Sequence, residues 1–503
     1  MIGVGLAFDS ALANASAFGG AVAPRCCDRG AIDFDKLGVV HIATKRAFDS
    51  FKIGPVPITG KLNAVGKPSS QIVHEPHRAF AITPADKVGQ DQTPGLRTAQ
   101  HRAIEYGQDD RRRRLVLSNS PARMSPAPLR LLHLHSSFAP GGKELRAVKL
   151  MNAFGPGVAH TVVSGVVGEL GAASAVNDDI SVAYPADFPA LAGKPSPLRW
   201  WRIARAMRGF DLVLTYNWGA MDAVGAHRML ARVVGLPPLV HHEDGFNHDE
   251  VHGLKPIRNR FRALTLGTAA ALVVPSRVLE AIAASVWWVK PARLKRIANG
   301  IPLDAYALDG PTNGLPGLAK PAGALWLGTL AGLRAVKNLP RLVRAFAALP
   351  GQWELVIVGE GGERAAILAE AARLGVAHRV HLPGFAPDPA QVLRTFDLFA
   401  LSSDSEQFPI SVVEAMAAGL AVVSPAVGDV AGMVAAENQP LITPPGDEPA
   451  LAAALLRAAN DPVLRTAAGA ANRARARADY GEPAMVAAYR AVYASALGHS
   501  QFP

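Results

Sequence analysis

The sequence predicts an α/β fold of two doubly wound parallel-sheet domains. From Leu129 onward, short apolar strands alternate with helical stretches, the alternation stops in a Gly- and Pro-rich stretch at 304–323, and it then restarts. Strands that alternate with helices are typical of parallel sheets. A chain of 503 residues also exceeds the ~250–300 residues that one core normally supports. We therefore expect one domain at 124–305 and another at 320–480, with a linker between them.

Composition excludes several classes of protein. Hydrophobic residues make up 49% of the chain and charged residues 18%, which excludes a disordered chain. Cys26 and Cys27 are the only cysteines, and adjacent cysteines rarely form a relaxed disulfide. Neither a disulfide scaffold nor a cysteine-based zinc site is expected. No apolar run reaches the ~18–20 residues of a membrane-spanning helix, so we expect a cytoplasmic location, either free or peripheral to the inner face of the membrane.

Residues 1–123 differ from the rest of the sequence. They mix Pro, Gly and short apolar pieces without a helical or strand period, and they carry +6 of the formal net charge of +11. Two interpretations stay open: a poorly structured or disordered N-terminal extension, or a mis-assigned start with translation beginning at Met124. The other 380 residues carry only +5, so we expect no nucleic-acid partner.

The first predicted domain carries polar residues where its strands end. Strands are expected at 129–134, 211–217, 238–244 and 271–276, with an amphipathic helix at 143–154. Gly141 and Gly142 precede that helix and would let a ligand approach its N-terminus closely. After the strand at 238–244 comes a polar cluster that indicates a metal site, contacts to sugar hydroxyls and phosphate, or simple solvation of the strand end. It comprises His241, His242, Glu243, Asp244, His248 and Asp249. No second ligand cluster accompanies it, so we expect no metal.

A basic aromatic helix is predicted within 194–210. Trp200 and Trp201 stand there beside five Lys and Arg residues. Such a helix can lie on an anionic membrane, or it can be an ordinary surface helix whose apolar side packs inward. Peripheral contact with an anionic membrane is therefore one of two interpretations.

The second predicted domain places two cations after its first strand. Arg334 and Lys337 would suit a nucleotide diphosphate at the carboxyl end of that strand, and a solvated basic loop is the alternative. Gly359 belongs to a glycine-rich turn between the next strand and its helix. Strands are expected at 324–330, 354–360, 379–385, 397–403 and 420–425, and helices at 338–349, 362–374, 409–419, 447–459, 461–479 and 482–497.

Residues 402–429 form the richest segment. Glu406 lies in the loop after a strand, and Pro409 suits the first turn of the following helix. Glu414 then falls inside an apolar helix, where a carboxylate needs a partner because burying it alone is costly. The N-terminus of this helix is also a natural diphosphate site. Two ordinary surface carboxylates are the alternative interpretation.

Taken together and in this order, these segments resemble the retaining glycosyltransferases of family 4, which have the GT-B fold of two Rossmann-like domains. The resemblance covers Leu129 to the C-terminus. Its most specific element is Glu406, seven residues and Glu414, similar to the family's E-x7-E motif, with the continuation EAMAAGLAVVSPAVGD. Supporting matches are IANGIP at 297–302, VPS at 274–276, IVGEGGER and HLPGF.

The resemblance implies transfer of a sugar from a nucleoside-diphosphate sugar to a glycan, lipid-linked or polysaccharide acceptor, with retention of configuration and without a metal or other cofactor. Glu406 would contact the donor sugar, Glu414 would bind the ribose, and Lys337 would neutralise the leaving diphosphate beside Arg334. The last helix, within 481–503, would cross back to the first domain. The other residues implied in substrate binding are Gly141, Gly142, Asn299, Gly359, Gln407, Phe408, Pro409, Ile410 and Ser411.

Three motifs depart from the family pattern. The family's G-R-L reads Ala-Gly-Leu at 331–333, which leaves Arg334 as the substitute cation. The family's E-H-G reads Glu-Asp-Gly at 243–245, so Asp244, His241 or His242 would take the role of the missing histidine. E-G-F reads Glu-Gln-Phe at 406–408. Two alternatives therefore stay open: a sugar-nucleotide 2-epimerase of the same architecture, and a catalytically impaired sugar-nucleotide-binding protein.

Overall fold

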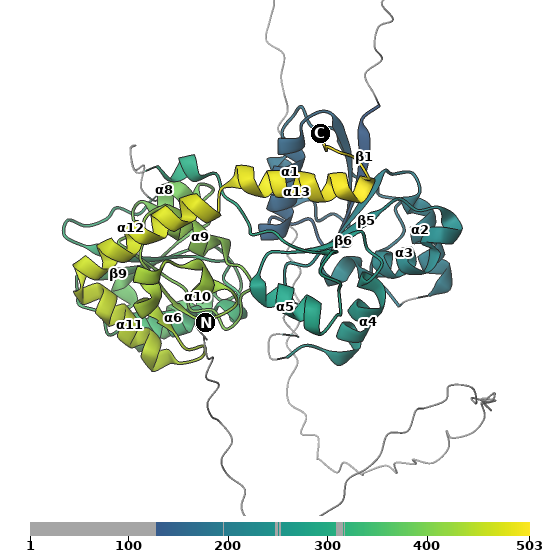
Figure 1. The fold of residues 1–503 in the computed structure, drawn as a ribbon. Coiled ribbons are helices and arrows are strands. Elements are labelled where there is room, and N and C mark those ends of the chain that lie inside the picture. Colours follow the sequence, from purple (N-terminus) through teal and green to yellow (C-terminus); the bar gives the residue numbers. More distant parts are fainter. Residues whose placement is uncertain (1–126, 195, 247–249, 251–252, 308–314, 316) are drawn as a thin grey trace, which may run out of the picture. The chain divides into compact units, whose positions relative to one another are not determined.

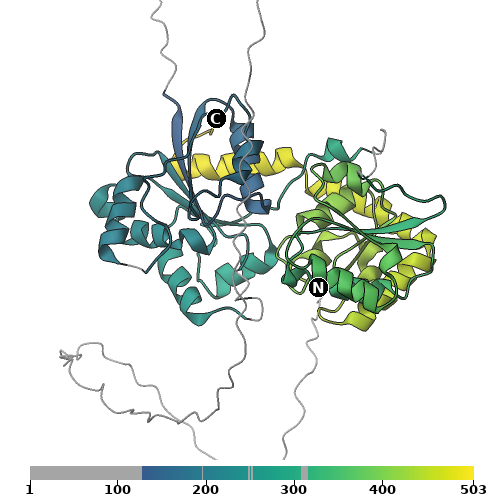
Figure 2. The same ribbon diagram turned by 180° about the vertical axis from the view of Figure 1, so that it is seen from behind.

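Two parallel sheets carry the fold (Figures 1 and 2). The computed structural model describes residues 127–194, 196–246, 250, 253–307, 315 and 317–503. The interpretations of residues 1–123 lie outside this part of the chain, as do His248 and Asp249 of the polar cluster.

The first sheet has seven parallel strands in the order β3-β2-β1-β4-β5-β6-β7. Its central strands are apolar and buried because helices cover both faces. The chain moves outward from β1 in both directions, so a topological switch point lies between β1 and β4, where α/β proteins commonly bind ligands. The strands are β1 (Leu129–His135), β2 (Val158–Ser164), β3 (Val182–Ala183), β4 (Leu212–Tyr216), β5 (Leu239–His242), β6 (Ala271–Val274) and β7 (Leu294–Arg296).

Helices cover the two faces of this sheet through separate apolar clusters. One face packs against α1 (Gly142–Phe154) and the C-terminal helix α13 (Glu482–Leu497). The other face packs against α2 (Pro197–Met207), α3 (Met221–Val234), α4 (Pro256–Leu266) and α5 (Arg277–Ser285). Within α2, Ile203, Ala204 and Met207 point into the core, so this helix does pack its apolar side inward.

The second sheet has six parallel strands in the order β10-β9-β8-β11-β12-β13. They are β8 (Leu325–Leu330), β9 (Trp353–Val358), β10 (Val380–Gly384), β11 (Leu398–Ala400), β12 (Val422–Pro425) and β13 (Ile442–Thr443). The helices are α6 (Leu339–Phe346), α7 (Arg364–Arg373), α8 (Pro389–Leu393), α9 (Ile410–Ala417), α10 (Val430–Met433), α11 (Glu448–Asn460) and α12 (Pro462–Asp479). The predicted pair of doubly wound sheets is confirmed. Strands β3, β7 and β13 were not predicted, because two or three residues carry little periodicity. Strand β2 was also not predicted.

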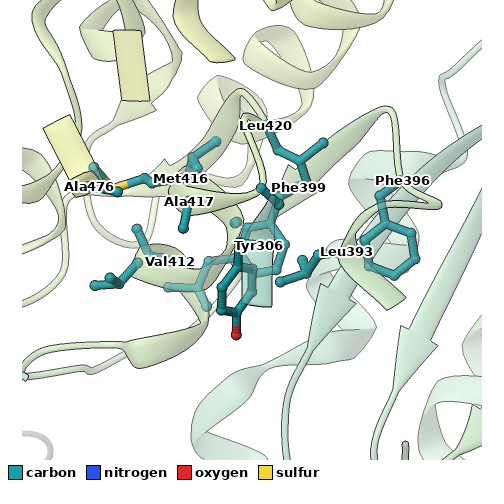
Figure 3. Close-up of a cluster of buried hydrophobic side chains, with 14 of the residues drawn as sticks. Tyr306, Leu393, Phe396, Phe399, Val412, Met416, Ala417, Leu420 and Ala476 are labelled. Atoms are coloured by element: carbon teal, nitrogen blue, oxygen red, sulfur yellow. The ribbon is translucent and has the colours of Figure 1, made fainter. Parts of the chain in front are cut away.

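A buried apolar cluster holds α9 against the second sheet (Figure 3). Val412 and Met416 of this helix pack in the cluster with Phe396 and Phe399. A Cβ on Gly328 of β8 would lie 1.9 Å from the Phe396 ring, so only glycine lets that ring pack on the strand. This packing fixes the N-terminus of α9 just after the loop that carries Glu406.

The C-terminal helix α13 returns to the first sheet. Met485, Tyr489 and Tyr493 lie in the same apolar cluster as the strands of that sheet. At the start of the helix, a Cβ on Gly300 would lie 2.8 Å from the Cα of Glu482. The returning chain therefore passes close to the segment 297–302, and Gly300 of IANGIP leaves room for this contact.

Candidate active site

A cavity of about 520 Å³ lies at the carboxyl ends of strands from both sheets. Its lining comes from the loops after β1, β4 and β5 of the first sheet and after β8 and β11 of the second. Such a crevice is where open α/β sheets bind ligands. The lining residues are Ala139, Pro140, Gly141, Gly142, Lys143, Glu144, Asn217, Asp244, Gly245, Phe246, Arg334, Val336, Lys337, Ser405, Glu406 and Gln407.

On the second domain, an ion pair lies at the cavity wall. Lys337 Nζ donates to Glu406 Oε1 at 2.5 Å, and Ser403 Oγ donates to the same oxygen at 2.6 Å. Lys337 ends the 3-10 turn η5 (Ala335–Lys337), and its carbonyl accepts from Ser402 Oγ at 2.9 Å. Both charged side chains are mostly buried. Two sequence-predicted residues are thus brought together.

A glycine-rich turn supports the loop that carries Arg334. Gly359 has φ 142°, and a Cβ there would lie 1.9 Å from the carbonyl oxygen of Ala331. The same loop is held by hydrogen bonds from Leu333 N to Glu360 O (2.9 Å) and from Glu363 N to Leu333 O (3.1 Å). Gly359 therefore shapes the loop and does not line the cavity, contrary to the expectation that it binds substrate. Arg334 is exposed and lines the cavity.

On the first domain, the start of α1 faces the cavity. A Cβ on Gly142 would lie 3.3 Å from Ile410 Cδ1, so the small residue allows close approach of α1 to the first residue of α9. Lys143 and Glu144 follow, line the cavity and form an ion pair. Burial lowers the pKa of Lys143 to about 8, while Asp244 acts to raise it. Neither Lys143 nor Glu144 was predicted from the sequence to be a site residue.

Asp244 also lines the cavity, but its charge is already paired. Arg146 of α1 binds it with both Nη atoms, Nη2 to Oδ2 at 2.9 Å, and Arg146 also donates to Asn299 Oδ1 at 3.0 Å. Burial alone would raise the pKa of Asp244, but Arg146 holds it below its ordinary value. The backbone of Asp244 donates to Asn217 Oδ1 at 2.7 Å. Asn299, expected to bind substrate, instead orients Arg146 and lies outside the cavity lining.

His241 and His242 do not reach the cavity. The expectation that one of them could take the role of the missing family histidine in place of Asp244 is therefore wrong. Both side chains are buried inside the first domain. His241 Nδ1 lies 2.8 Å from Thr215 Oγ1, and His242 Nε2 lies 3.0 Å from the hydroxyl of Tyr493 in α13. Burial lowers the pKa of His242 to about 3. Within β5, successive side chains alternate between faces, and both faces here are covered by packed elements.

The remaining predicted site residues lie just before α9 or within it. Gln407 lines the cavity, whereas Phe408 is buried against Tyr480 with ring centroids 5.7 Å apart. Pro409 is the N-cap of α9, whose N-terminus has no side-chain cap. Ile410, Ser411 and Glu414 are half-buried and lie outside the cavity lining. Burial raises the pKa of Glu414, while a hydrogen bond with Tyr306 acts to lower it.

The described part of the chain contains no group of three or more His, Cys, Asp and Glu side chains placed to hold a metal ion. Across the same residues, no helix is both long and apolar enough to span a membrane.

A family model matches the second domain. Residues 318–475 match the model of glycosyl transferases group 1. The matched residues include Arg334, Lys337 and Glu406, which line the cavity, and Gly359 and Glu414, which lie outside its lining.

Curated relatives match part of the chain. D-inositol 3-phosphate glycosyltransferase of Mycobacteroides abscessus is 31% identical over 160 residues, which is 31% of this chain and 36% of that protein. GDP-mannose-dependent alpha-mannosyltransferase of Mycobacterium tuberculosis is 27% identical over 271 residues, which is 52% of this chain and 68% of that protein. The match thus spans between about a third and two thirds of these two relatives.

The fold comparison extends over both domains of the chain. The crystal structure of Anabaena HepE in complex with UDP superposes with a TM-score of 0.60 and 20% identity, over 73% of this chain and 100% of that chain. At this identity the likeness concerns the fold alone. The two sheets therefore have the GT-B architecture that the sequence resemblance implied.

Proposed function

We propose that this chain transfers a sugar from a nucleoside-diphosphate sugar to a glycan, lipid-linked or polysaccharide acceptor, with retention of configuration. The observation that carries the proposal is the Lys337–Glu406 pair at the wall of a cavity that both domains line. The match of residues 318–475 to the glycosyl transferases group 1 model supports a sugar-transfer reaction. Lys337 and Arg334 would stabilise the diphosphate leaving group as negative charge develops on it, which is the largest electrostatic demand of such a reaction.

Each side chain then has a task in the proposed reaction. Glu406 would accept hydrogen bonds from the donor sugar, and the uncapped N-terminus of α9 would supply backbone N–H groups to phosphate oxygens. Lys143, opposite these groups on the first domain, would meet the phosphates or an anionic acceptor group. Because cations and a helix N-terminus would supply the stabilisation, we propose that no divalent metal is required.

Asp244 replaces the histidine common in the family and would face the sugar or acceptor with one edge of its carboxylate. Its other contacts are occupied by Arg146, so it would act as a fixed hydrogen-bond acceptor. A half-buried carboxylate whose pKa is held low stays ionised at neutral pH. The proposed enzyme therefore has a negatively charged contact at the position of the family's histidine. This difference would affect which donor sugar the enzyme accepts.

The experiment is a panel of UDP-, GDP- and ADP-sugars incubated with the purified full chain, with and without a chelator, and with nucleoside diphosphate release as the readout. We expect slow hydrolysis of one donor, unchanged by the chelator. Binding of a donor without release, even with candidate acceptors present, would instead indicate a sugar-nucleotide-binding protein. Conversion of the donor at C2 without release of the diphosphate would indicate a 2-epimerase.

A further inference from the structure

Helices α2, α3 and α4 of the first domain are neighbours and share one surface. The proposed function does not use this surface. Figures 1 and 2 show them together on one side of the first sheet. They meet where Trp200 of α2 and Phe261 of α4 approach each other over Gly225 of α3, with ring centroids 6.2 Å apart. A Cβ on Gly225 would lie 3.0 Å from both rings, so glycine permits this crossing. We call the outward side of the three helices the α2–α4 face.

Large apolar side chains are exposed on all three helices of the α2–α4 face. Trp201 of α2 is 45% exposed, Met229 and Val233 of α3 are 65% and 82% exposed, and Ile257 of α4 is 78% exposed. Leu198 and Leu264 are also exposed. An apolar cavity of about 440 Å³ opens between α2 and α3, lined by Ser196, Pro197, Trp200, Trp201, Met229 and Leu230. Exposed apolar residues that cluster in this way mark an interaction surface.

The same face is strongly basic. The three helices contain eight arginines, of which Arg199, Arg258 and Arg262 are paired with Asp222, Glu250 and Glu243. The positive charge of the face therefore comes from the other five arginines. Arg202 and Arg205 of α2 and Arg228 and Arg232 of α3 are exposed, and among the described residues no carboxylate pairs with any of the four. On α2, the residues Leu198, Trp201, Arg202 and Arg205 recur at intervals of three and four, so the apolar and basic side chains share one stripe.

Apolar side chains interleaved with arginines fit an anionic lipid surface better than other charged partners. A nucleic acid would attract the arginines but would gain nothing from exposed Val233 and Ile257. A bilayer interface accepts both kinds of group, because apolar side chains enter the headgroup region and arginines meet lipid phosphates. We propose that the α2–α4 face docks this protein on an anionic membrane, with Trp201 and Met229 entering the interface around the apolar cavity.

Docking would place the candidate active site close to the lipid surface. Arg262, on the inner side of α4, binds Glu243 at 3.0 Å and lies over the ring of Phe246, a residue of the cavity lining. One helix thickness therefore separates the α2–α4 face from the cavity wall. Delivery of a lipid-linked acceptor to the cavity rests on the proposed function, whereas membrane binding itself does not.

The test is co-sedimentation of the full chain with vesicles of phosphatidylcholine alone and of phosphatidylcholine mixed with phosphatidylglycerol. We expect binding only to the anionic vesicles, weakened by salt. The variant Arg202→Gln/Arg205→Gln should lower the partition coefficient roughly twentyfold, since each arginine near the surface contributes about fivefold. At high salt, where apolar insertion dominates, the variant Trp201→Ser/Met229→Ser should have a lower partition coefficient than the Arg202→Gln/Arg205→Gln variant. The variant Arg457→Gln/Arg477→Gln changes the net charge equally on exposed arginines of α11 and α12 and should bind as the wild type does.

Three outcomes would overturn the proposal: no binding to either vesicle, equal loss in the α11/α12 control, or wild-type binding by the Trp201→Ser/Met229→Ser variant. Binding to a DNA duplex that depends on Arg202 and Arg205 but not on Trp201 would assign the face to nucleic acid instead. All substituted residues are exposed, so melting temperatures should stay unchanged and exclude misfolding. A failure to bind vesicles would not change the result of the donor panel, so the two proposals are tested separately.

Discussion

Lys337 Nζ lies 2.5 Å from Glu406 Oε1, although 69 residues separate the two in the chain. The contact arises because β8 and β11 are neighbours in the second sheet, and the loops after both strands end at the same edge. Asp404 joins these loops further by binding Arg341 and Asn338. The protein therefore holds the cation proposed to bind the diphosphate against the carboxylate proposed to bind the sugar.

Removing the carboxylate of this pair should strengthen the binding of nucleoside diphosphate. In Glu406→Gln, the Lys337 ammonium loses its anionic partner and becomes available to the ligand. Lys337→Met should instead weaken the same affinity about 10- to 100-fold, because a charge-assisted hydrogen bond contributes ~1.5–3 kcal/mol. Isothermal titration with UDP, GDP and ADP checks both. Wild-type affinity in Lys337→Met would show that Lys337 does not bind the diphosphate, and weaker binding in Glu406→Gln would contradict the release of Lys337.

Gly359 should tolerate no side chain, whereas its neighbour Gly362 should. Gly359→Ala puts a Cβ into the carbonyl of Ala331 at a φ of 142°. We expect a loss of ~2 kcal/mol or more in the free energy of unfolding and weaker nucleotide binding through the displaced Arg334 loop. Gly362 has open space around it and no positive φ, so Gly362→Ala should stay within ~0.5 kcal/mol of the wild type. Chemical denaturation measures both, and equal stability of the two variants would contradict the role given to Gly359.

The buried pair of Arg146 and Asp244 should be more sensitive to single than to double substitution. Arg146→Met leaves Asp244 without its cation, and Asp244→Asn leaves a buried guanidinium beside a neutral amide. Each single change should cost ~3 kcal/mol of unfolding free energy. The double variant Arg146→Met/Asp244→Asn should recover part of that loss, because no unpaired charge stays buried. Additive losses in the double variant would indicate that the two side chains do not act as a pair.

Nucleoside diphosphate binding should weaken between pH 7 and pH 9. Burial lowers the pKa of Lys143 from an ordinary 10.5 to about 8, so this side chain loses its charge in that window. Lys143→Arg keeps its charge, and its affinity should stay level over the same range. An identical pH dependence in wild type and Lys143→Arg would remove Lys143 from the phosphate contacts.

The same pKa shift affects stability with a defined sign. The folded protein releases the Lys143 proton near pH 8, whereas the unfolded chain keeps it until about 10.5. Between these values the unfolded state binds more protons, so this group makes the folded state relatively more stable as the pH rises. Lys143→Arg keeps its charge over this range, so its free energy of unfolding should rise less than that of the wild type between pH 8 and pH 10. An equal rise in the two proteins would contradict the buried-charge interpretation.

Sequence patterns predicted the site where its residues are close in the chain. Glu406, Gln407 and the start of α9 follow from one strand-loop-helix segment, and the alternation of strands and helices predicted both sheets. The partner of Asp244 could not be predicted, because Arg146 lies 98 residues away and its role depends on the pairing of β1, β4 and β5. His241 and His242 were misplaced for a related reason: two adjacent strand residues point to opposite faces, and α13, distant in sequence, covers one of them.

We propose that the cavity with Lys337 and Glu406 breaks the bond between a sugar and a nucleoside diphosphate. The most direct measurement is the initial rate of nucleoside diphosphate release, with the donor that the panel identifies, for the wild type and for Glu406→Gln. We expect release by the wild type and a rate at least about 100-fold lower for Glu406→Gln, together with retained nucleotide binding. A Glu406→Gln rate equal to that of the wild type would contradict it.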